Sequence, residues 1–178
     1  MTDDEINDEV SFCDVEDEVR RADTLGRVLK DVETATGGAI KISDLVAAQR
    51  TVDIGCGRGA YGLLMRRFGN VNRIVGIEVV PNYQDGDAYD TYTEIIFRDI
   101  RLTETIEKVQ NNTPDCIIAI GVPPTVNRFI IENYYRFGLS QNGFIVLISD
   151  VEQRRNIAPF HEYNGSYVID NYIFVYGR

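Results

Sequence analysis

The sequence is organised around residues 51–62, which read Thr51-Val52-Asp53-Ile54-Gly55-Cys56-Gly57-Arg58-Gly59-Ala60-Tyr61-Gly62. The first four residues are mostly β-branched, as in a buried strand, and three alternating glycines then precede an apolar helical pattern. Glycine allows a tight turn and close approach of a ligand to the backbone, and the free N–H groups of the following helix favour a carboxylate or phosphate. The pattern therefore predicts a strand, a turn and a helix with a ligand at the turn.

The composition is that of one globular domain. The chain has 178 residues, of which 44% are hydrophobic and 26% charged, and both fractions are ordinary for such a domain. No apolar run approaches the roughly 20 residues that span a bilayer, so we expect no contact with a membrane. Three widely spaced cysteines, Cys13, Cys56 and Cys116, fit reduced thiols better than a disulfide framework or a zinc site. We therefore expect a cytoplasmic protein without a bound metal.

The acidity of the chain is concentrated at one end. The formal net charge is −10, but residues 1–19 hold nine acidic residues and no basic ones. The remainder has 19 acidic against 18 basic residues. We predict an acidic, disordered tail over residues 1–14 and a single domain over residues 15–178. The alternative is a tail that docks on a protein partner or screens a basic groove. Fifteen arginines in the body also leave room for a nucleic-acid-binding patch.

Helical and strand patterns alternate along the chain. This alternation predicts a three-layer α/β sandwich with a mostly parallel, seven-stranded sheet and a C-terminal antiparallel hairpin. The helix after the second strand is expected to be shortened or missing, because residues 81–92 are rich in Pro, Gly and Asp. Ser43 is the expected cap of the second helix. We predict helices over 15–34, 44–49, 60–68, 103–110 and from the 121–124 segment to about 137, and strands over 51–54, 73–79, 93–97, 115–120, 144–149, 166–170 and 172–176.

Polar or small residues follow the predicted strands where each one ends. Glu78 ends the second strand, Asp99 follows the third and Gly121 follows the fourth. In open α/β sheets such strand ends meet at one ligand-binding crevice. A carboxylate at Glu78 can accept both hydroxyls of a ribose, Asp99 can bond an adenine amino group with Ile100 against the base, and Gly121 leaves space for a ligand.

With these residues the chain resembles the class I S-adenosylmethionine-dependent methyltransferases over about residues 42–178. Asp53–Gly59 resembles their first motif, Glu78 their ribose-binding acid and Phe97–Ile100 their adenine-contacting segment. The resemblance implies a Rossmann-like fold, methyltransferase activity and S-adenosyl-L-methionine as the cofactor. It implies these cofactor-binding residues: Asp53, Gly55, Cys56, Gly57, Gly59, Tyr61, Glu78, Val79, Asp99, Ile100 and Gly121.

The residues that would bind the methyl acceptor cannot be assigned from the sequence. Val122-Pro123-Pro124-Thr125 is similar to the Asn/Asp-Pro-Pro-aromatic motif of methyltransferases that act on adenine or glutamine, but it lacks both the polar and the aromatic residue. Catalytic residues and the methyl acceptor are therefore unassigned. Cys56 is interpreted as a small residue of the loop, and His161 as a surface residue rather than a general base.

Two other functions stay open from the sequence. One is a non-catalytic methyltransferase-like subunit that acts through a protein partner. The other is an NAD-binding oxidoreductase, because residues 57–62 also fit the pattern G-x-G-x-x-G. Asp53 within the strand and Asp99 after the third strand favour the methyltransferase.

Overall fold

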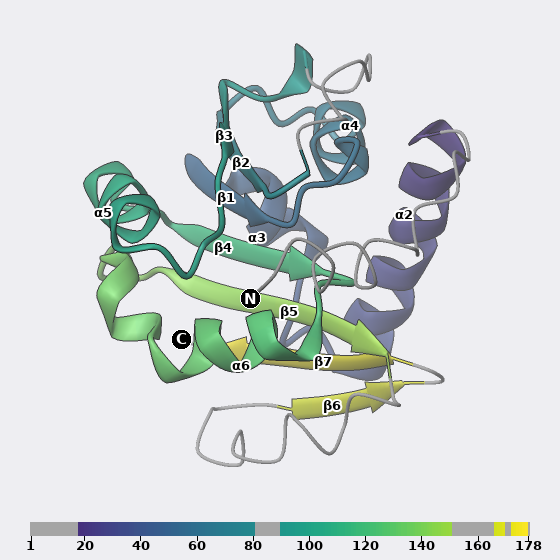
Figure 1. Ribbon diagram of the computed structural model, residues 1–178. Helices are drawn as coiled ribbons and strands as arrows, with labels where there is room; N and C mark the ends of the chain where they lie inside the picture. Colours follow the sequence, from purple (N-terminus) through teal and green to yellow (C-terminus); the bar gives the residue numbers. More distant parts are fainter. Residues whose placement is uncertain (1–17, 81–89, 151–165, 170–171, 178) are drawn as a thin grey trace.

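The computed structural model describes residues 18–80, 90–150, 166–169 and 172–177. They form one seven-stranded sheet in the order β3-β2-β1-β4-β5-β7-β6 (Figure 1). Strands β1 to β5 run parallel, β7 lies antiparallel to β5, and β6 lies antiparallel to β7. The prediction of an α/β fold built on parallel strands is confirmed.

The elements alternate along the chain as the sequence predicts. The helices are α2 (Glu18–Ala35), α3 (Ile42–Ala47), α4 (Ala60–Arg67), α5 (Thr103–Asn112), α6 (Pro124–Glu132) and the 3-10 helix η3 (Tyr134–Phe137). The strands are β1 (Arg50–Ile54), β2 (Arg73–Glu78), β3 (Glu94–Phe97), β4 (Cys116–Ile120), β5 (Phe144–Asp150), β6 (Ser166–Ile169) and β7 (Tyr172–Gly177). The predicted tail and most of the segment after β2 lie outside the described residues.

Each face of the sheet has its own hydrophobic core. On one face, side chains of α2, α3 and α4 pack against residues such as Ile74 and Ile118. On the other face, side chains of α5, α6 and η3 pack against residues such as Val52 and Ile117. Because successive strand residues point to opposite faces, Asp53 is directed to the α4 side while its neighbours Val52 and Ile54 fill the other core. The described helices and strands form three layers.

Two helix boundaries differ from the predictions. Ser43 lies inside α3 instead of capping it, because the Glu33 Oε2 atom accepts the free N–H of Ile42 at 3.2 Å and the helix begins there. The helix predicted to reach residue 137 stops at Glu132 and continues as η3. At this boundary Asn133 is the C-cap of α6, and both its backbone N–H and its side-chain amide donate to the Phe129 carbonyl, at 3.1 and 2.9 Å.

The order of the strands places a crevice at their carboxyl ends. The chain leaves β1 toward β2 on one side and β4 lies on the other side, so the connections diverge above β1. Open α/β sheets bind ligands at such a point. None of the described helices is long and apolar enough to cross a membrane.

Candidate functional site

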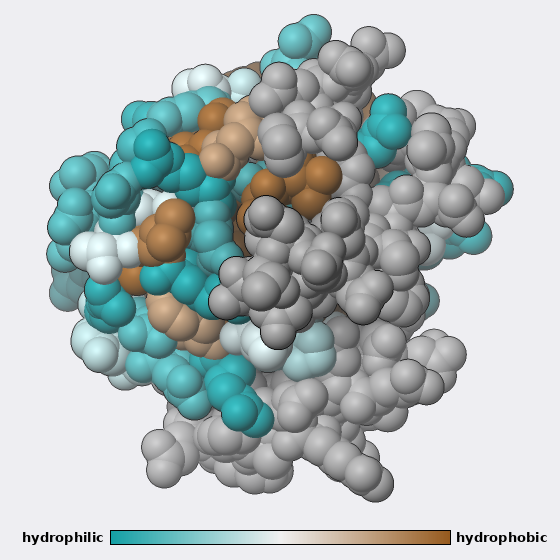
Figure 2. All heavy atoms as spheres, in the orientation of Figure 1, coloured by the Kyte–Doolittle hydropathy of each residue, from teal (hydrophilic) through white to brown (hydrophobic). Residues whose placement is uncertain are grey.

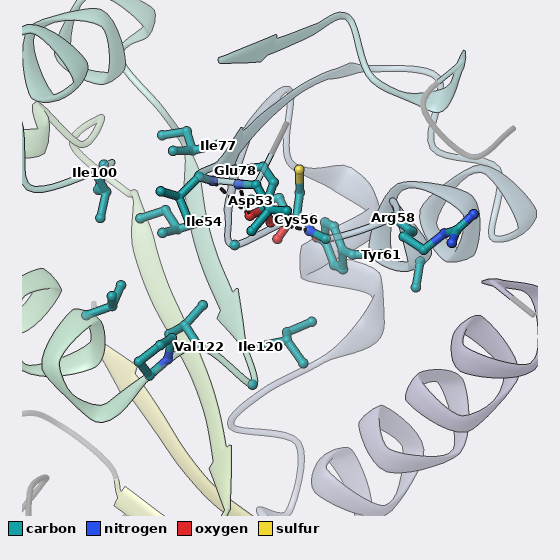
Figure 3. Close-up of a pocket in the computed structure, with 18 of the residues that line it drawn as sticks. Asp53, Ile54, Cys56, Arg58, Tyr61, Ile77, Glu78, Ile100, Ile120 and Val122 are labelled. Atoms are coloured by element: carbon teal, nitrogen blue, oxygen red, sulfur yellow. Dashed lines mark hydrogen bonds between the residues drawn. The ribbon is translucent and has the colours of Figure 1, made fainter. Parts of the chain in front are cut away.

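A cavity of about 400 Å³ opens at the carboxyl ends of β1, β2, β3 and β4. Figure 3 shows its lining as a layer of aliphatic side chains around two carboxylates, Asp53 and Glu78. Figure 2 shows one face of the molecule, on which polar residues cover most of the described area and apolar residues form patches among them. The predicted residues that line the cavity are Asp53, Gly55, Cys56, Gly57, Tyr61, Glu78, Val79, Asp99, Ile100 and Gly121.

The glycine loop adopts a backbone that only glycine enters readily. Gly55, Gly57 and Gly59 have φ values of 72°, 53° and 92°, all in the left-handed region. A Cβ atom on Gly55 would overlap with Val122 Cγ1, so the loop after β1 lies directly against the loop after β4. Gly59 does not line the cavity; it is the N-cap of α4, where its role is to start the helix.

Glu78 connects this loop to the end of β2 through hydrogen bonds to backbone amides. Its Oε2 atom accepts the Gly57 N–H at 2.8 Å, and its Oε1 atom accepts the N–H groups of Val79 and Val80 at 2.8 and 2.9 Å (Figure 3). The side chain is 6% exposed. A carboxylate that accepts three backbone amides is strongly fixed, so Glu78 organises the backbone around the cavity as well as facing it.

Asp53 is the second carboxylate, and it is 2% exposed. Its Oδ2 atom accepts a hydrogen bond from the Tyr92 hydroxyl, which itself accepts the Gly62 N–H at 3.1 Å. Burial raises the pKa of Asp53, the Tyr92 hydrogen bond lowers it and the nearby Glu78 charge raises it, which leaves the pKa at about 7. The sequence did not predict a role for Tyr92 in the site, because its contact with Asp53 spans 39 residues and leaves no local pattern.

Asp99 is paired with Arg101, a contact that the sequence analysis did not include. The Arg101 side chain bonds both of its oxygens, with Nε at 2.9 Å from Oδ1 and Nη2 at 2.6 Å from Oδ2, and the Arg101 amide adds a bond to Oδ1 at 2.8 Å. Burial alone would raise the pKa of Asp99, but the Arg101 hydrogen bonds hold it below its ordinary value. Asp99 is therefore a charged, paired group at the edge of the cavity.

The loop after β4 borders the remaining side of the cavity. Gly121 has a φ of 64°, and a Cβ there would meet no atom within 4 Å, so open space adjoins the strand end. Asn127 of α6 is fully buried and donates to the Val122 carbonyl at 3.4 Å and to Ser149 Oγ at 3.3 Å. These contacts join the ends of β4 and β5 and hold Val122 against Gly55.

Helix α2 contributes lining residues that the sequence reading did not assign to the site. Arg21 and Leu25 lie one turn apart and both line the cavity. Helix α2 is held against α4, since Arg67 Nη1 lies 2.7 Å from Asp23 Oδ1 and Gly26 lies close to Leu64. The spacing of four residues between Arg21 and Leu25 was the available signal, but it also fits ordinary packing of an amphipathic helix.

Cys56 of the glycine loop and Tyr61 of α4 are buried groups whose pKa values are raised. Burial raises the pKa of the Cys56 thiol, and nearby Asp53 and Glu78 raise it further, so the thiolate is not formed near neutral pH. Burial likewise raises the pKa of Tyr61. The interpretation of Cys56 as a small residue of the loop agrees with this environment. His161 lies outside the described residues.

Comparisons with known proteins show which solved structures share this fold. No family model and no curated protein matches the sequence. Solved structures do: a ribosomal protein L11 methylase from Lactobacillus delbrueckii subsp. bulgaricus (TM-score 0.55, 12% identity, 82% of this chain and 74% of that one) and a precorrin-6y C5,15-methyltransferase from Geobacter metallireducens (0.53, 18%, 72% and 78%). An O-methyltransferase family protein from Burkholderia thailandensis also matches (0.58, 10%, 89% and 59%).

These neighbours are methyltransferases by name, and their strand-and-helix arrangement covers most of this chain. The protein therefore has the fold of the class I S-adenosylmethionine-dependent methyltransferases. The names of two neighbours give different acceptors, a ribosomal protein and precorrin-6y, so the fold carries no information on the acceptor of this chain.

Proposed function

We propose that the protein is an S-adenosylmethionine-dependent methyltransferase whose cofactor occupies the cavity at the ends of β1 to β4. The observation that carries the proposal is the position of Glu78. It is a buried carboxylate at the end of β2, bonded to the glycine loop and facing a cavity at the point where the connections diverge. Such a carboxylate beside a glycine turn suits a ribose.

The residues present fit this cofactor. The volume of about 400 Å³ lies within the range of roughly 300–1,000 Å³ for ligand pockets. A carboxylate has about four acceptor positions, and backbone amides take three of those on Glu78, so one position is left for a ribose hydroxyl. Ile100 and Val122 offer apolar surface to a base, and the open space beside Gly121 offers room for it.

Catalysis would depend mainly on how the chain positions the acceptor relative to the methyl group. The bound cofactor supplies a methyl group activated by its sulfonium. The chain's part is to hold the acceptor in line with that group and to keep water out, and orientation of this kind can supply much of the rate. Val122, Pro123 and Val126 form the apolar wall from which an acceptor would approach. We assign no general base.

The first experiment measures binding of S-adenosylhomocysteine by calorimetry to the wild type, Glu78→Gln and Glu107→Gln. Glu107 is an exposed residue of α5 and serves as the charge-matched control. We expect one site in the wild type, a loss of at least tenfold in affinity for Glu78→Gln, and no change for Glu107→Gln. Equal binding by all three proteins would contradict the placement of the ribose at Glu78.

The finer assignments are proposals of the same kind. The acceptor is unassigned, with nucleic acid among the candidates, and the protein is proposed to work in the cytoplasm. The acidic tail is proposed as a docking segment for a basic protein partner. Binding of S-adenosylhomocysteine without turnover on any acceptor would favour a subunit that acts through such a partner. Tighter binding of NAD would favour the oxidoreductase.

A further inference from the structure

Tyr92 is buried in a narrow space that two glycines, Gly62 of α4 and Gly76 of β2, leave open for its ring. Its side chain is buried, and a Cβ atom on Gly62 would lie 2.9 Å from its Cζ atom, while one on Gly76 would lie 3.1 Å from its Cδ1 atom. The preceding residue is fixed as well, since Arg66 Nη2 donates to the Thr91 carbonyl at 2.9 Å. Two glycines and an arginine therefore hold the tyrosine ring between α4 and β2.

The direction of the Tyr92 hydrogen bonds follows from the groups involved. The Gly62 amide can only donate, so the Tyr92 oxygen accepts that bond at 3.1 Å, and its single hydrogen is left for Asp53 Oδ2. Gly62 lies in the first turn of α4, where amides have no acceptor within the helix. Tyr92 thus connects the positive end of the helix to the carboxylate of Asp53 and favours its charged form.

The charge of Asp53 near neutrality depends on this bond. Burial and the Glu78 charge raise the pKa of Asp53 and the Tyr92 hydrogen bond opposes them, with a result of about 7. The other titratable groups around Asp53 are Cys56, Tyr61 and Cys116, and burial raises the pKa of each. They stay neutral near pH 7, so Asp53 and Glu78 are the negative charges in this part of the site.

We propose that Tyr92 is a positioning residue: it holds Asp53 Oδ2, so that Oδ1 and the carboxylate charge receive an ammonium group of the bound ligand. Asp53 lines the cavity, and Tyr92 is its one hydrogen-bond donor among the described residues. A buried carboxylate at a cavity wall is best compensated by a cation. The proposal rests on the proposed function, because the amino-acid end of S-adenosylmethionine carries such an ammonium.

The first test needs no ligand. The Asp53 carboxyl is titrated by ¹³C NMR in the wild type, in Tyr92→Phe and in Thr105→Val. Thr105 is a fully buried residue of α5 whose hydroxyl has no hydrogen-bond partner among the described residues. Its variant therefore also removes a buried hydroxyl, but on the helix that covers the other face of the sheet. We expect Tyr92→Phe to raise the pKa of Asp53 by about one pH unit or more and Thr105→Val to leave it unchanged. An unchanged pKa in Tyr92→Phe would overturn the proposal.

The second test follows binding of two ligands by calorimetry between pH 5.5 and 7.5. S-adenosylhomocysteine carries the ammonium, whereas 5′-methylthioadenosine keeps the nucleoside and the sulfur without it. We expect wild-type affinity for the first to rise about tenfold with pH as Asp53 ionises, and affinity for the second to change less than twofold. Tyr92→Phe should weaken the binding of S-adenosylhomocysteine at pH 7 about fivefold and leave the binding of 5′-methylthioadenosine unchanged. In Asp53→Asn the affinity for S-adenosylhomocysteine should no longer depend on pH.

Two outcomes count against the proposal in different ways. Equal weakening of both ligands in Tyr92→Phe would show a general structural defect and overturn the positioning role. Failure of the wild type to bind either ligand would contradict the proposed function and with it the ammonium. The NMR titration still tests the Tyr92–Asp53 bond in that case. Should Tyr92→Phe not fold by circular dichroism, a wild-type affinity that does not change with pH would suffice to overturn the proposal.

Discussion

The Oε2 atom of Glu78 accepts a hydrogen bond from the Gly57 amide at 2.8 Å, across 21 residues of sequence. This contact joins the end of β2 to the glycine loop, together with the bonds that Gly55 and Cys56 donate from their amides to the Ile77 carbonyl at 2.8 and 3.1 Å, and the carboxylate lines the cavity. Ligand binding and the stability of the loop are therefore coupled through the Glu78 side chain.

Glu78→Gln should destabilise the protein as well as weaken ligand binding. The amide NH₂ of glutamine replaces an acceptor with a donor opposite backbone N–H groups, so at least one bond to a charged acceptor is lost, worth about 1–3 kcal/mol. The free energy of unfolding from urea titrations measures this, with Glu107→Gln as the control. Stability equal to that of the control would contradict the role of Glu78 in holding the loop.

Gly55→Ala should be destabilising for two separable reasons. The left-handed backbone at φ 72° is unfavourable for alanine by about 1–2 kcal/mol, and the new methyl group overlaps with Val122 Cγ1. We expect a total loss of at least about 2 kcal/mol. In a Val122→Ala background the overlap is gone and only the backbone strain is left. An equal loss in both backgrounds would show that the two loops are not in contact.

Gly62→Ala tests whether the Tyr92 ring packs against Gly62. In an ordinary helix this change stabilises by up to about 1 kcal/mol, but here the Cβ would overlap with Thr91 Oγ1 and the Tyr92 ring. We expect destabilisation of about 2 kcal/mol or more. Gly69→Ala is the comparison, since its φ is 88° but no atom lies within 4 Å of a Cβ. A smaller loss for Gly62→Ala than for Gly69→Ala would place Tyr92 elsewhere.

Asp53→Asn should change how stability depends on pH. Because the pKa of Asp53 is about 7 in the folded protein against an ordinary 3.8, the folded state binds the proton more tightly, and wild-type stability falls as pH rises from about 4 to 7. Asparagine stays neutral and still accepts the Tyr92 hydroxyl. The variant should therefore gain about 2–4 kcal/mol over wild type at pH 8 and nothing at pH 4. A pH-independent difference in thermal unfolding would refute the shifted pKa.

Local patterns explain why much of the fold was predictable from the sequence. The β-branched run of β1, the alternating glycines and the position of Glu78 at the end of β2 are each set within a few residues. Ten of the eleven predicted site residues line the cavity. Gly59 was assigned to the ligand because it belongs to the same motif, but the chain needs it to start α4.

The features that were missed depend on contacts between distant segments. Glu33 caps α3 from nine residues away, and Tyr92 reaches Asp53 across 39 residues. Neither leaves a periodic signal. The pairing of Asp99 with Arg101 is different, because residues two apart after a strand can meet in a turn. That contact was accessible from the sequence, and the bond between Asp99 and an adenine stays a prediction.

Calorimetric titration of the wild-type protein with S-adenosylhomocysteine and, separately, with NAD tests directly whether the cavity binds the methyltransferase cofactor. We predict one site for S-adenosylhomocysteine per chain, with an affinity at least tenfold above that for NAD, and competition by S-adenosylmethionine for the same site. Absence of S-adenosylhomocysteine binding at millimolar concentration, or tighter binding of NAD, would contradict it.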